Sequence, residues 1–320
     1  MSLAQSAKRL IRKSKLLNTL ATQAYLAGIQ PMMTRRRARS RGLDVAFSAN
    51  SIDVFDSRRR VRIARAHAIY LNDVIGNFAY FHEAVHPDAS GLVDYSGPRL
   101  HQVAGFDLHP VWFPSLAEPV ATTEQYLDFA NLSEGGVAID LGAYSGLTSI
   151  MFRQLCGDSG RVVAVDADAG NLEAIRKNLA LYEGKTGRRI DLLEGAVWTH
   201  NRGISFSCEG CMGSSATDIV GDRMGVAELV PSFTLNDIAD RYGLDRVDFI
   251  KCDIEGAEAV IFADDAFFAR FKPRIIVEVH PVDGGLTDRA VMDVLGRYGY
   301  RFAMVQQAGD SFPLLECRAD

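Results

Sequence analysis

A short glycine-bearing turn between two apolar segments constrains the fold of this chain most. The turn, Asp140-Leu-Gly-Ala-Tyr-Ser-Gly146, follows the apolar run 137–140 and precedes a helical pattern over residues 147–155. A helix that begins directly behind a buried strand directs unpaired N–H groups, and the positive end of its dipole, at whatever the turn holds. A second apolar run ends at Asp166, about 20 residues beyond the turn, where a doubly wound fold binds a ribose hydroxyl. The chain is therefore predicted to bind a nucleoside-type cofactor.

The residue two positions after the first glycine indicates which nucleoside cofactor fits. The dinucleotide fingerprint G-x-G-x-x-G needs a second glycine so that a pyrophosphate can approach the backbone. Here that position is Tyr144, whose side chain leaves little room for a pyrophosphate. The carboxylate and ammonium of a methionine moiety need less space, so the turn favours a methionine-bearing nucleoside.

Beyond residue 118, apolar segments alternate with helical patterns. Strands are expected at residues 137–140, 161–166, 190–196, 247–252 and 273–280. Helices are expected at residues 122–131, 146–156, 170–182, 255–263 and 287–298, and a closing hairpin at 301–306 and 312–317. This alternation is typical of an α/β fold whose parallel sheet is covered on both faces. Residues 197–237 form an insertion, in which residues 208–215 are expected to be a loop over the cofactor.

Two acidic segments near the end of the chain point to a family. Val247-Asp-Phe-Ile-Lys-Cys-Asp-Ile-Glu-Gly-Ala-Glu258 is predicted to be a strand that turns into a helix at an acidic loop. Pro273-Arg-Ile-Ile-Val-Glu-Val-His280 is predicted to be a buried strand that ends in an acid and a histidine. With the turn at 140–146, these motifs resemble the FkbM family of S-adenosylmethionine (SAM) methyltransferases. The resemblance covers residues 115–317 and implies a Rossmann-like class I methyltransferase sheet, mostly parallel, with an antiparallel terminal hairpin.

The resemblance implies SAM as the cofactor. The residues expected to contact it are Asp140, Gly142, Tyr144, Ser145, Gly146, Asp166, Ala167, Ala196 and Asp253. Two of these positions depart from the family: Tyr144 stands where asparagine is usual, and Asp166-Ala-Asp168 replaces the more usual Glu-Pro.

Three side chains at the ends of the fourth and fifth strands are the catalytic candidates. Asp253 follows one strand, Glu278 and His280 end the other, and neighbouring parallel strands bring such groups to one edge. Asp253 is expected to act as a general base or to orient the cofactor's ammonium. Glu278 or His280 is expected to take the acceptor proton, for which imidazole is well matched near neutral pH. A metal-free site is favoured, and the alternative is Mg²⁺ held by Asp253 and Glu278.

The acidic loop also bears on the acceptor. Enzymes that methylate exocyclic amines of bases carry Asn/Asp-Pro-Pro-aromatic at this place, whereas this chain has Asp253-Ile-Glu-Gly256. We therefore expect O-methylation of a hydroxyl on a small molecule or glycan, of the sugar or polyketide type that the resemblance suggests. One alternative is an NAD(P)-dependent oxidoreductase, which Tyr144 and the absence of a Ser-Tyr-Lys constellation disfavour. Another is a non-catalytic docking protein, which the intact acids in the motifs disfavour.

The net charge of −5 conceals a basic N-terminal arm. Residues 1–66 hold 15 Lys/Arg and 3 Asp/Glu, a net +12, whereas the rest holds 20 and 37, a net −17. A basic arm on an acidic body suggests an anionic partner for the arm, which is a membrane surface, nucleic acid or the body itself, and nucleic acid is the least favoured. The alternative is a solvated, partly flexible arm without a partner. We assign residues 1–117 to this arm and a helical extension, and residues 118–320 to the methyltransferase domain.

A heptad-like apolar stripe predicts a helix over residues 58–84. The stripe consists of Val61, Ala64, Ala68, Leu71, Ile75 and Phe78, at steps of three and four. Such a stripe packs either on its own domain or against a second copy, so a homodimer contact is one expectation.

The five cysteines and the hydropathy indicate a cellular location. An odd number of cysteines without framework spacing is typical of reduced thiols, and Cys208-x-x-Cys211 lacks the second pair that a four-ligand zinc site needs. No apolar run reaches the roughly 18 residues of a membrane span. A cytoplasmic protein is therefore expected, with peripheral membrane contact through the basic arm.

Overall fold

The computed structural model describes residues 30–117, 120–208, 215–216, 226–282, 285–308 and 312–319. The chain divides into two compact units, Met1–Tyr95 and Ser96–Asp320. The division lies before the boundary at 117/118 that we expected, because Val111 and Phe113 belong to the core of the second unit. Residues 1–29 of the basic arm, and residues 209–214 of the expected loop over the cofactor, lie outside the described residues. Among the described helices, none has the length and apolarity needed to cross a membrane.

The first unit is a small antiparallel sheet with short helices. Its strands are β1 (Asp44–Phe47), β2 (Ser51–Phe55) and β3 (Arg60–Ala64), in the order β1-β2-β3. Its helices are α3 (Gln30–Arg39), the 3-10 helix η2 (Arg65–Tyr70), α4 (Leu71–Gly76) and α5 (Phe78–Glu83). The N-terminal extension is therefore of mixed α and β structure, not helical as expected.

The prediction of one continuous helix over residues 58–84 is wrong. Residues 60–64 pair with β2 as a strand, in which buried Val61 and Ile63 alternate with Arg60 and Arg62. Short helices follow, and α4 ends at Asn77, whose backbone leaves the helical region. Five of the six stripe residues are buried in the described structure, namely Val61, Ala64, Leu71, Ile75 and Phe78. The apolar spacing thus reflects the core of the first unit. The structure has no long helix over residues 58–84 along which a second copy could pack.

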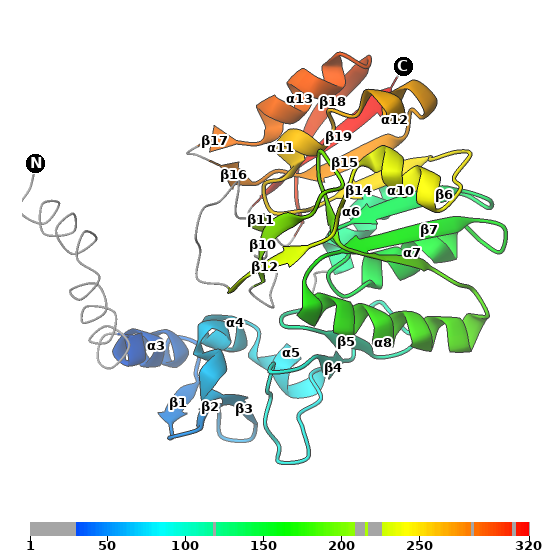
Figure 1. Cartoon of the computed structure of the whole chain (residues 1–320). Coiled ribbons are helices and arrows are strands. Elements are labelled where there is room, and N and C mark those ends of the chain that lie inside the picture. Colours follow the sequence, from blue (N-terminus) through cyan, green and yellow to red (C-terminus); the bar gives the residue numbers. More distant parts are fainter. Residues whose placement is uncertain are drawn as a thin grey trace, which may run out of the picture. The chain divides into compact units, whose positions relative to one another are not determined.

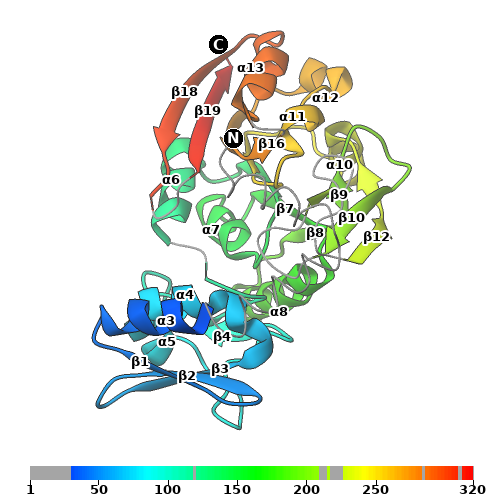
Figure 2. The same ribbon diagram turned by 90° about the vertical axis from the view of Figure 1, so that its left-hand side faces the viewer.

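The second unit is built on a seven-stranded sheet in the order β18-β19-β15-β14-β6-β7-β8 (Figure 1). Its parallel strands are β6 (Val137–Leu141), β7 (Arg161–Asp166), β8 (Asp191–Glu194), β14 (Phe249–Cys252) and β15 (Arg274–Glu278). The hairpin of β18 (Tyr300–Gln306) and β19 (Pro313–Ala319) adds an antiparallel edge (Figure 2). The Rossmann-like sheet with its terminal hairpin is confirmed.

Helices cover both faces of this sheet, since alternate strand residues enter two separate cores. One core contains residues of α6 (Val120–Ala130), α7 (Leu147–Leu155) and α8 (Ala169–Thr186), packed against strand residues such as Ala138 and Phe249. The other contains residues of α10 (Leu235–Arg241), α11 (Glu258–Ile261), α12 (Asp265–Arg270) and α13 (Asp288–Gly296), packed against residues such as Ile139 and Ile250. Of these, α10 and α12 were not predicted.

Short strands complete the second unit. They are β4 (Arg99–His101), β5 (Val111–Phe113), β9 (Ala196–Val197), β10 (Ile204–Cys208), β11 (Ser215–Ala216), β12 (Val226–Val230), β13 (Ser232–Phe233), β16 (Pro281–Val282) and β17 (Gly285–Leu286). β10, β11 and β12 form a sheet of their own within the insertion, and β13 pairs in parallel with β9. The insertion therefore contains strands that the sequence analysis did not predict, and most of the loop expected at residues 208–215 lies outside the described residues.

Candidate functional site

A pocket lies at the carboxyl ends of the central strands of the second unit. Its polar lining consists of Thr122, Thr123, Tyr126, Thr148, Asp166, Asn171, Lys251, Asp253, Glu255, Glu278 and Gln307. Its apolar lining includes Val165, Ala167, Ala196, Val197, Trp198, Ile204, Phe206, Ile254 and Phe312. The carboxyl ends of parallel strands are where open α/β sheets bind their ligands, particularly where the strand order reverses. Here the order reverses between β6 and β14, so the pocket has the position expected of a functional site.

The glycine turn forms one wall of this pocket and lies against the acidic loop. Gly142 has φ of +75°, and a Cβ on it would lie 1.7 Å from the backbone oxygen of Asp253. Only glycine satisfies both the left-handed backbone and this close approach. The two loops that the sequence singled out are therefore in direct backbone contact.

Tyr144 is anchored at both ends. Its φ of 52° is unusual for a residue other than glycine, and its backbone N–H donates to Asp166 Oδ2 at 2.8 Å. Its hydroxyl donates to the carbonyl of Leu116 at 2.7 Å and lies 2.6 Å from Ser115 Oγ. These contacts hold the turn at a fixed distance from the end of β7.

Asp166 is buried at the pocket wall and carries several hydrogen bonds. Besides Tyr144, it accepts from the backbone N–H of Asp168 at 2.9 Å and from Asn171 Nδ2 at 3.3 Å. Burial raises the pKa of Asp166 to about 7, although these donors act against the rise. The Oδ1 atom of Asn171 is buried with no hydrogen-bond partner among the described residues. The pair therefore offers a carboxylate and an orphaned acceptor to a ligand with hydroxyl or amine donors.

The structure separates the nine expected cofactor residues into two groups. Those that line the pocket are Gly142, Tyr144, Asp166, Ala167, Ala196 and Asp253. The other three, Asp140, Ser145 and Gly146, do not line it and instead shape the turn. Ser145 Oγ accepts from the N–H of Leu147, and Gly146, with φ of +80°, is the residue before α7. Asp140 is fully buried and accepts from Ser149 Oγ at 2.5 Å, and its burial raises its pKa.

Lys251 is a functional residue that the sequence analysis missed. It lies in β14 with its side chain 3% exposed, and its Nζ donates to the carbonyl of Gly142 at 2.7 Å. Its Nζ also lies 3.6 Å from Asp140 Oδ1 and 3.5 Å from Asp253 Oδ2. A buried ammonium needs such partners, since an unpaired charge in the interior is very costly. Lys251 thus connects the glycine turn to the acidic loop.

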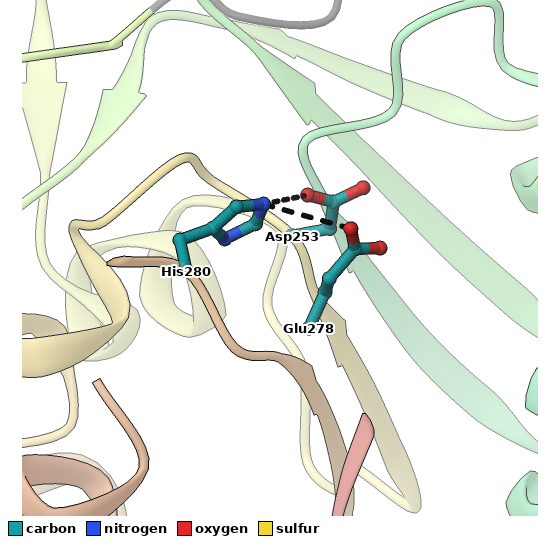
Figure 3. Close-up of side chains that lie close together, drawn as sticks. All are labelled: Asp253, Glu278 and His280. Atoms are coloured by element: carbon teal, nitrogen blue, oxygen red, sulfur yellow. Dashed lines mark ion pairs between the residues drawn. The ribbon is translucent and has the colours of Figure 1, made fainter. Parts of the chain in front are cut away.

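The three catalytic candidates come together at the ends of β14 and β15. Cys252 and Val277 are paired across these strands, so Asp253 and Glu278 follow at the same level. The Nε2 atom of His280 lies 3.7 Å from Asp253 Oδ1 and 3.6 Å from Glu278 Oε1. Figure 3 shows the imidazole edge facing both carboxylates. Asp253 and Glu278 line the pocket, whereas His280 lies behind them.

His280 is surrounded by acids. Its Nδ1 lies 3.0 Å from Glu258 Oε1, and its Nε2 lies 3.8 Å from Glu255 Oε1. Burial lowers the pKa of His280, but the hydrogen bond and charge of Glu258, with Asp253 and Glu255, outweigh burial and raise it to about 10. A histidine protonated at neutral pH cannot accept a proton, so this state does not fit the role of general base that the sequence left open for His280.

Glu258, the first residue of α11, holds two parts of the site together. Its side chain is fully buried, and its Oε1 also accepts from the N–H of Ile254 at 2.9 Å. It therefore fixes both the acidic loop and the ring of His280, which is 22 residues further along the chain.

Glu278 is held from its other side by two pocket residues. Its Oε2 accepts from Gln307 Nε2 at 3.1 Å and from the hydroxyl of Tyr126 at 3.3 Å. Burial, followed by the charge of Asp253, raises the pKa of Glu278 to about 8. Tyr126 and Gln307 were not singled out in the sequence, because nothing in their local pattern distinguishes them from ordinary core or loop residues.

The chain is similar to a family of known sequences and to several solved structures. Residues 140–302 match the family model described as the methyltransferase FkbM domain. Among solved structures, a precorrin-6Y C5,15-methyltransferase from Geobacter metallireducens is 20% identical, with a TM-score of 0.39 over 62% of this chain and 86% of that one. A methyltransferase FkbM from Methylobacillus flagellatus is 18% identical, with a TM-score of 0.40 over 61% of this chain and 50% of that one. An O-methyltransferase from Bacillus cereus, solved in complex with SAH, is 11% identical, with a TM-score of 0.39 over 64% of this chain and 83% of that one. No curated protein matches the chain.

Proposed function

Because the chain belongs to the FkbM methyltransferase family, with SAM as its methyl donor, we propose that it methylates a hydroxyl group on a sugar, polyketide or related small molecule or glycan. The observation that carries this proposal is the pair Asp253 and Glu278, which line the same pocket as the glycine turn. Two carboxylates beside a cofactor pocket suit an acceptor that must lose a proton when its oxygen is methylated.

The residues of the pocket fit SAM. Asn171 supplies a buried acceptor without a partner in the described structure, next to the carboxylate of Asp166, and these two would hold the ribose hydroxyls or adenine amine. Gly142 lines the pocket without a side chain, and the carboxylate of Asp253 would face the cofactor's ammonium. When bound, SAM supplies an electrophilic methyl group.

The residues around the carboxylates position the acceptor. Asp253 and Glu278 bind the acceptor hydroxyl by accepting its hydrogen bond, and this pair receives its proton. Tyr126 and Gln307 hold Glu278, and Lys251 holds Asp253, so neither carboxylate needs to reorganise during the reaction. Alignment of this kind contributes several kcal/mol to catalysis. The apolar wall that includes Trp198, Phe206 and Phe312 excludes water from the reacting groups.

The acidic loop supports a hydroxyl over an amine acceptor. It reads Asp253-Ile-Glu-Gly256, without the prolines and aromatic residue of enzymes that methylate exocyclic base amines. Glu255 in this loop has φ of 55° and Gly256 has φ of 108°, so the backbone curls back and directs carboxylates at the pocket. The identity of the hydroxyl compound follows from the family resemblance alone, which is an argument by analogy.

The proposal is tested with SAM labelled in its methyl group and a panel of acceptors. The panel contains free sugars, glycans, polyketide alcohols and, for contrast, nucleobases with exocyclic amines. We expect label to enter a hydroxyl compound, with the product sensitive to reagents that cleave methyl ethers. Glu278→Gln should reduce transfer by about 10²-fold or more, and the exposed Glu183→Gln should not. Label that enters only the amine acceptors would contradict O-methylation.

A further inference from the structure

The groups around His280 converge on a common point. The ligand-capable atoms of Asp253, Glu278 and His280 all lie within 4.8 Å of one another, and Glu255 Oε1 lies 3.8 Å from His280 Nε2. From this geometry we propose that the cluster binds a divalent cation, with Asp253, Glu278 and His280 as ligands. The sequence had favoured a metal-free site, with two carboxylates as the metal alternative. The structure adds an imidazole to that pair.

The distances fit a bound ion better than direct hydrogen bonds. The Nε2 atom of His280 is 3.6–3.8 Å from each of the three carboxylate oxygens, too far for an N–H···O bond, whose usual length is about 2.7–3.2 Å. A cation bonded to its ligands at about 2.0–2.3 Å separates them by roughly 3–4.5 Å, which includes these values. The side chain of His280 is 5% exposed and is directed at the carboxylates, as Figure 3 shows. The Nε2 atom of His280 is thus buried and faces the carboxylates, but it is too far from them for a hydrogen bond. This geometry indicates that an ion belongs between them.

Each proposed ligand has a second atom that is fixed from behind. Glu258 holds Nδ1 of His280 at 3.0 Å, so Nδ1 is the donor of this hydrogen bond. A bound cation would displace the proton that Nε2 carries in the protonated ring, and Nε2 would then be the ligand atom. Gln307 and Tyr126 hold Oε2 of Glu278, which leaves Oε1 toward the common point. Lys251 lies 3.5 Å from Oδ2 of Asp253, which leaves Oδ1. Metal-binding histidines commonly donate their other N–H to a carboxylate, and metal-binding carboxylates are held by hydrogen bonds in the same way.

Gln307 gives an independent sign that the cluster is incomplete. Its side chain is 5% exposed and lines the pocket, yet its Oε1 has no hydrogen-bond partner among the described residues. A hydrated cation beside Glu278 would supply water donors to this oxygen. Charge supports the same conclusion, because four carboxylates, including Glu258, face one imidazole here. A divalent cation offsets their mutual repulsion.

The donor set defines the kind of ion. Two carboxylates and one imidazole suit a cation that prefers oxygen ligands but also accepts nitrogen, for which Mn²⁺ and Mg²⁺ are the natural candidates. Asp253, Glu255 and Glu278 line the pocket, so open coordination positions would face the acceptor. A role for the ion in lowering the pKa of the acceptor hydroxyl rests on the proposed function, whereas binding of the ion does not.

To test the site, the full chain is first treated with EDTA and dialysed. It is then titrated with Mn²⁺ in the absence of SAM and acceptor. Electron paramagnetic resonance reports free Mn²⁺, and we expect one strong site per chain that Mg²⁺ displaces. Asp253→Asn and Glu278→Gln should each weaken Mn²⁺ binding at least tenfold. Glu258→Gln, which touches the ligand His280 but not the ion, should weaken it about 10–100-fold. The exposed Asp293→Asn and Glu183→Gln are matched controls and should bind as the unaltered chain does.

Circular dichroism and the midpoint of urea unfolding, measured on the same samples, show whether each variant is folded. Absence of a strong Mn²⁺ site in the folded, unaltered chain would overturn the proposal. So would a strong site that Asp253→Asn and Glu278→Gln leave unchanged. Because methyl transfer is not measured here, failure of the proposed O-methylation leaves this result unaffected, and failure of the metal site leaves the acceptor assay intact.

Discussion

The ammonium of Lys251 donates a hydrogen bond of 2.7 Å to the carbonyl oxygen of Gly142. This bond joins the middle of β14 to the turn after β6, two segments that are 109 residues apart. Since Gly142 also lies against the backbone of Asp253, the glycine turn contacts both β14 and the acidic loop that follows it. A change on either side is expected to affect both SAM binding and methyl transfer.

Replacing Lys251 tests this connection. Lys251→Met keeps most of the buried volume but leaves Asp140 without its cation in a site that excludes water. Removing one partner of a buried pair costs about 3–5 kcal/mol, so we expect a loss of stability of this order, measured by urea unfolding. Lys272→Met removes an exposed lysine and should change stability by less than about 0.5 kcal/mol. Equal stability of the two variants would show that the buried ammonium of Lys251 does not contribute to the stability of the fold.

Replacing Gly142 gives a second test of the contact between the turn and the acidic loop, and Gly184 in the same unit provides a matched control. Gly142→Ala places a Cβ against the backbone of Asp253 and forces a side chain into a left-handed conformation. We expect loss of detectable SAM binding and lower stability. Gly184 lies within α8, with no atom within 4 Å of an added Cβ, so Gly184→Ala should stabilise the chain by about 0.4–1 kcal/mol. Normal SAM affinity in Gly142→Ala would show that the turn can move away from the acidic loop.

The basic arm is expected to serve location rather than catalysis. Every residue that lines the pocket lies between residues 122 and 312, so deletion of residues 1–29 should leave the dissociation constant for SAM unchanged. Each basic residue near an anionic membrane contributes about 1 kcal/mol, and salt weakens the attraction. Since the deletion removes Lys8, Arg9, Arg12, Lys13 and Lys15, binding to phosphatidylserine vesicles at low salt should fall steeply. Neutral vesicles are the control, and unchanged binding to both kinds would refute membrane contact through this segment.

The parts of the fold that the sequence predicted are those with strong local signals. The strand Val137–Leu141 is apolar except for Asp140, and its five residues are all buried. The prediction of a helix over residues 58–84 failed because apolar residues at steps of three and four also arise when a strand and short helices each bury their own residues. Pairing of β3 with β2 is a non-local interaction, and it overrides the helical pattern.

In the site, the sequence identified groups at strand ends but not their partners. Asp253, Glu278 and His280 are adjacent because parallel strands end at one edge, which is a general rule of the fold. The contacts of Lys251 with Gly142, and of Glu258 with His280, depend on side chains that meet across 109 and 22 residues. No spacing in one sequence reveals these pairs. A lysine within an otherwise apolar strand was the one available sign, since a buried charge requires a partner.

We expect Asp166 to make the affinity for SAM dependent on pH. Burial raises its pKa to about 7, so it binds a proton as the pH falls through that value and loses the negative charge that ribose hydroxyls favour. We therefore expect the dissociation constant for SAM to be roughly constant above pH 8 and to rise progressively below pH 7, measured by calorimetry. Asp166→Ala should weaken binding by about 1.5–3 kcal/mol at pH 8, the usual contribution of hydrogen bonds to a charged group, and should remove most of the pH dependence. The exposed Asp293→Ala should retain both the affinity and its pH profile. An affinity that is flat from pH 6 to 8 in the unaltered chain, or unchanged in Asp166→Ala, would exclude Asp166 as the ribose acceptor.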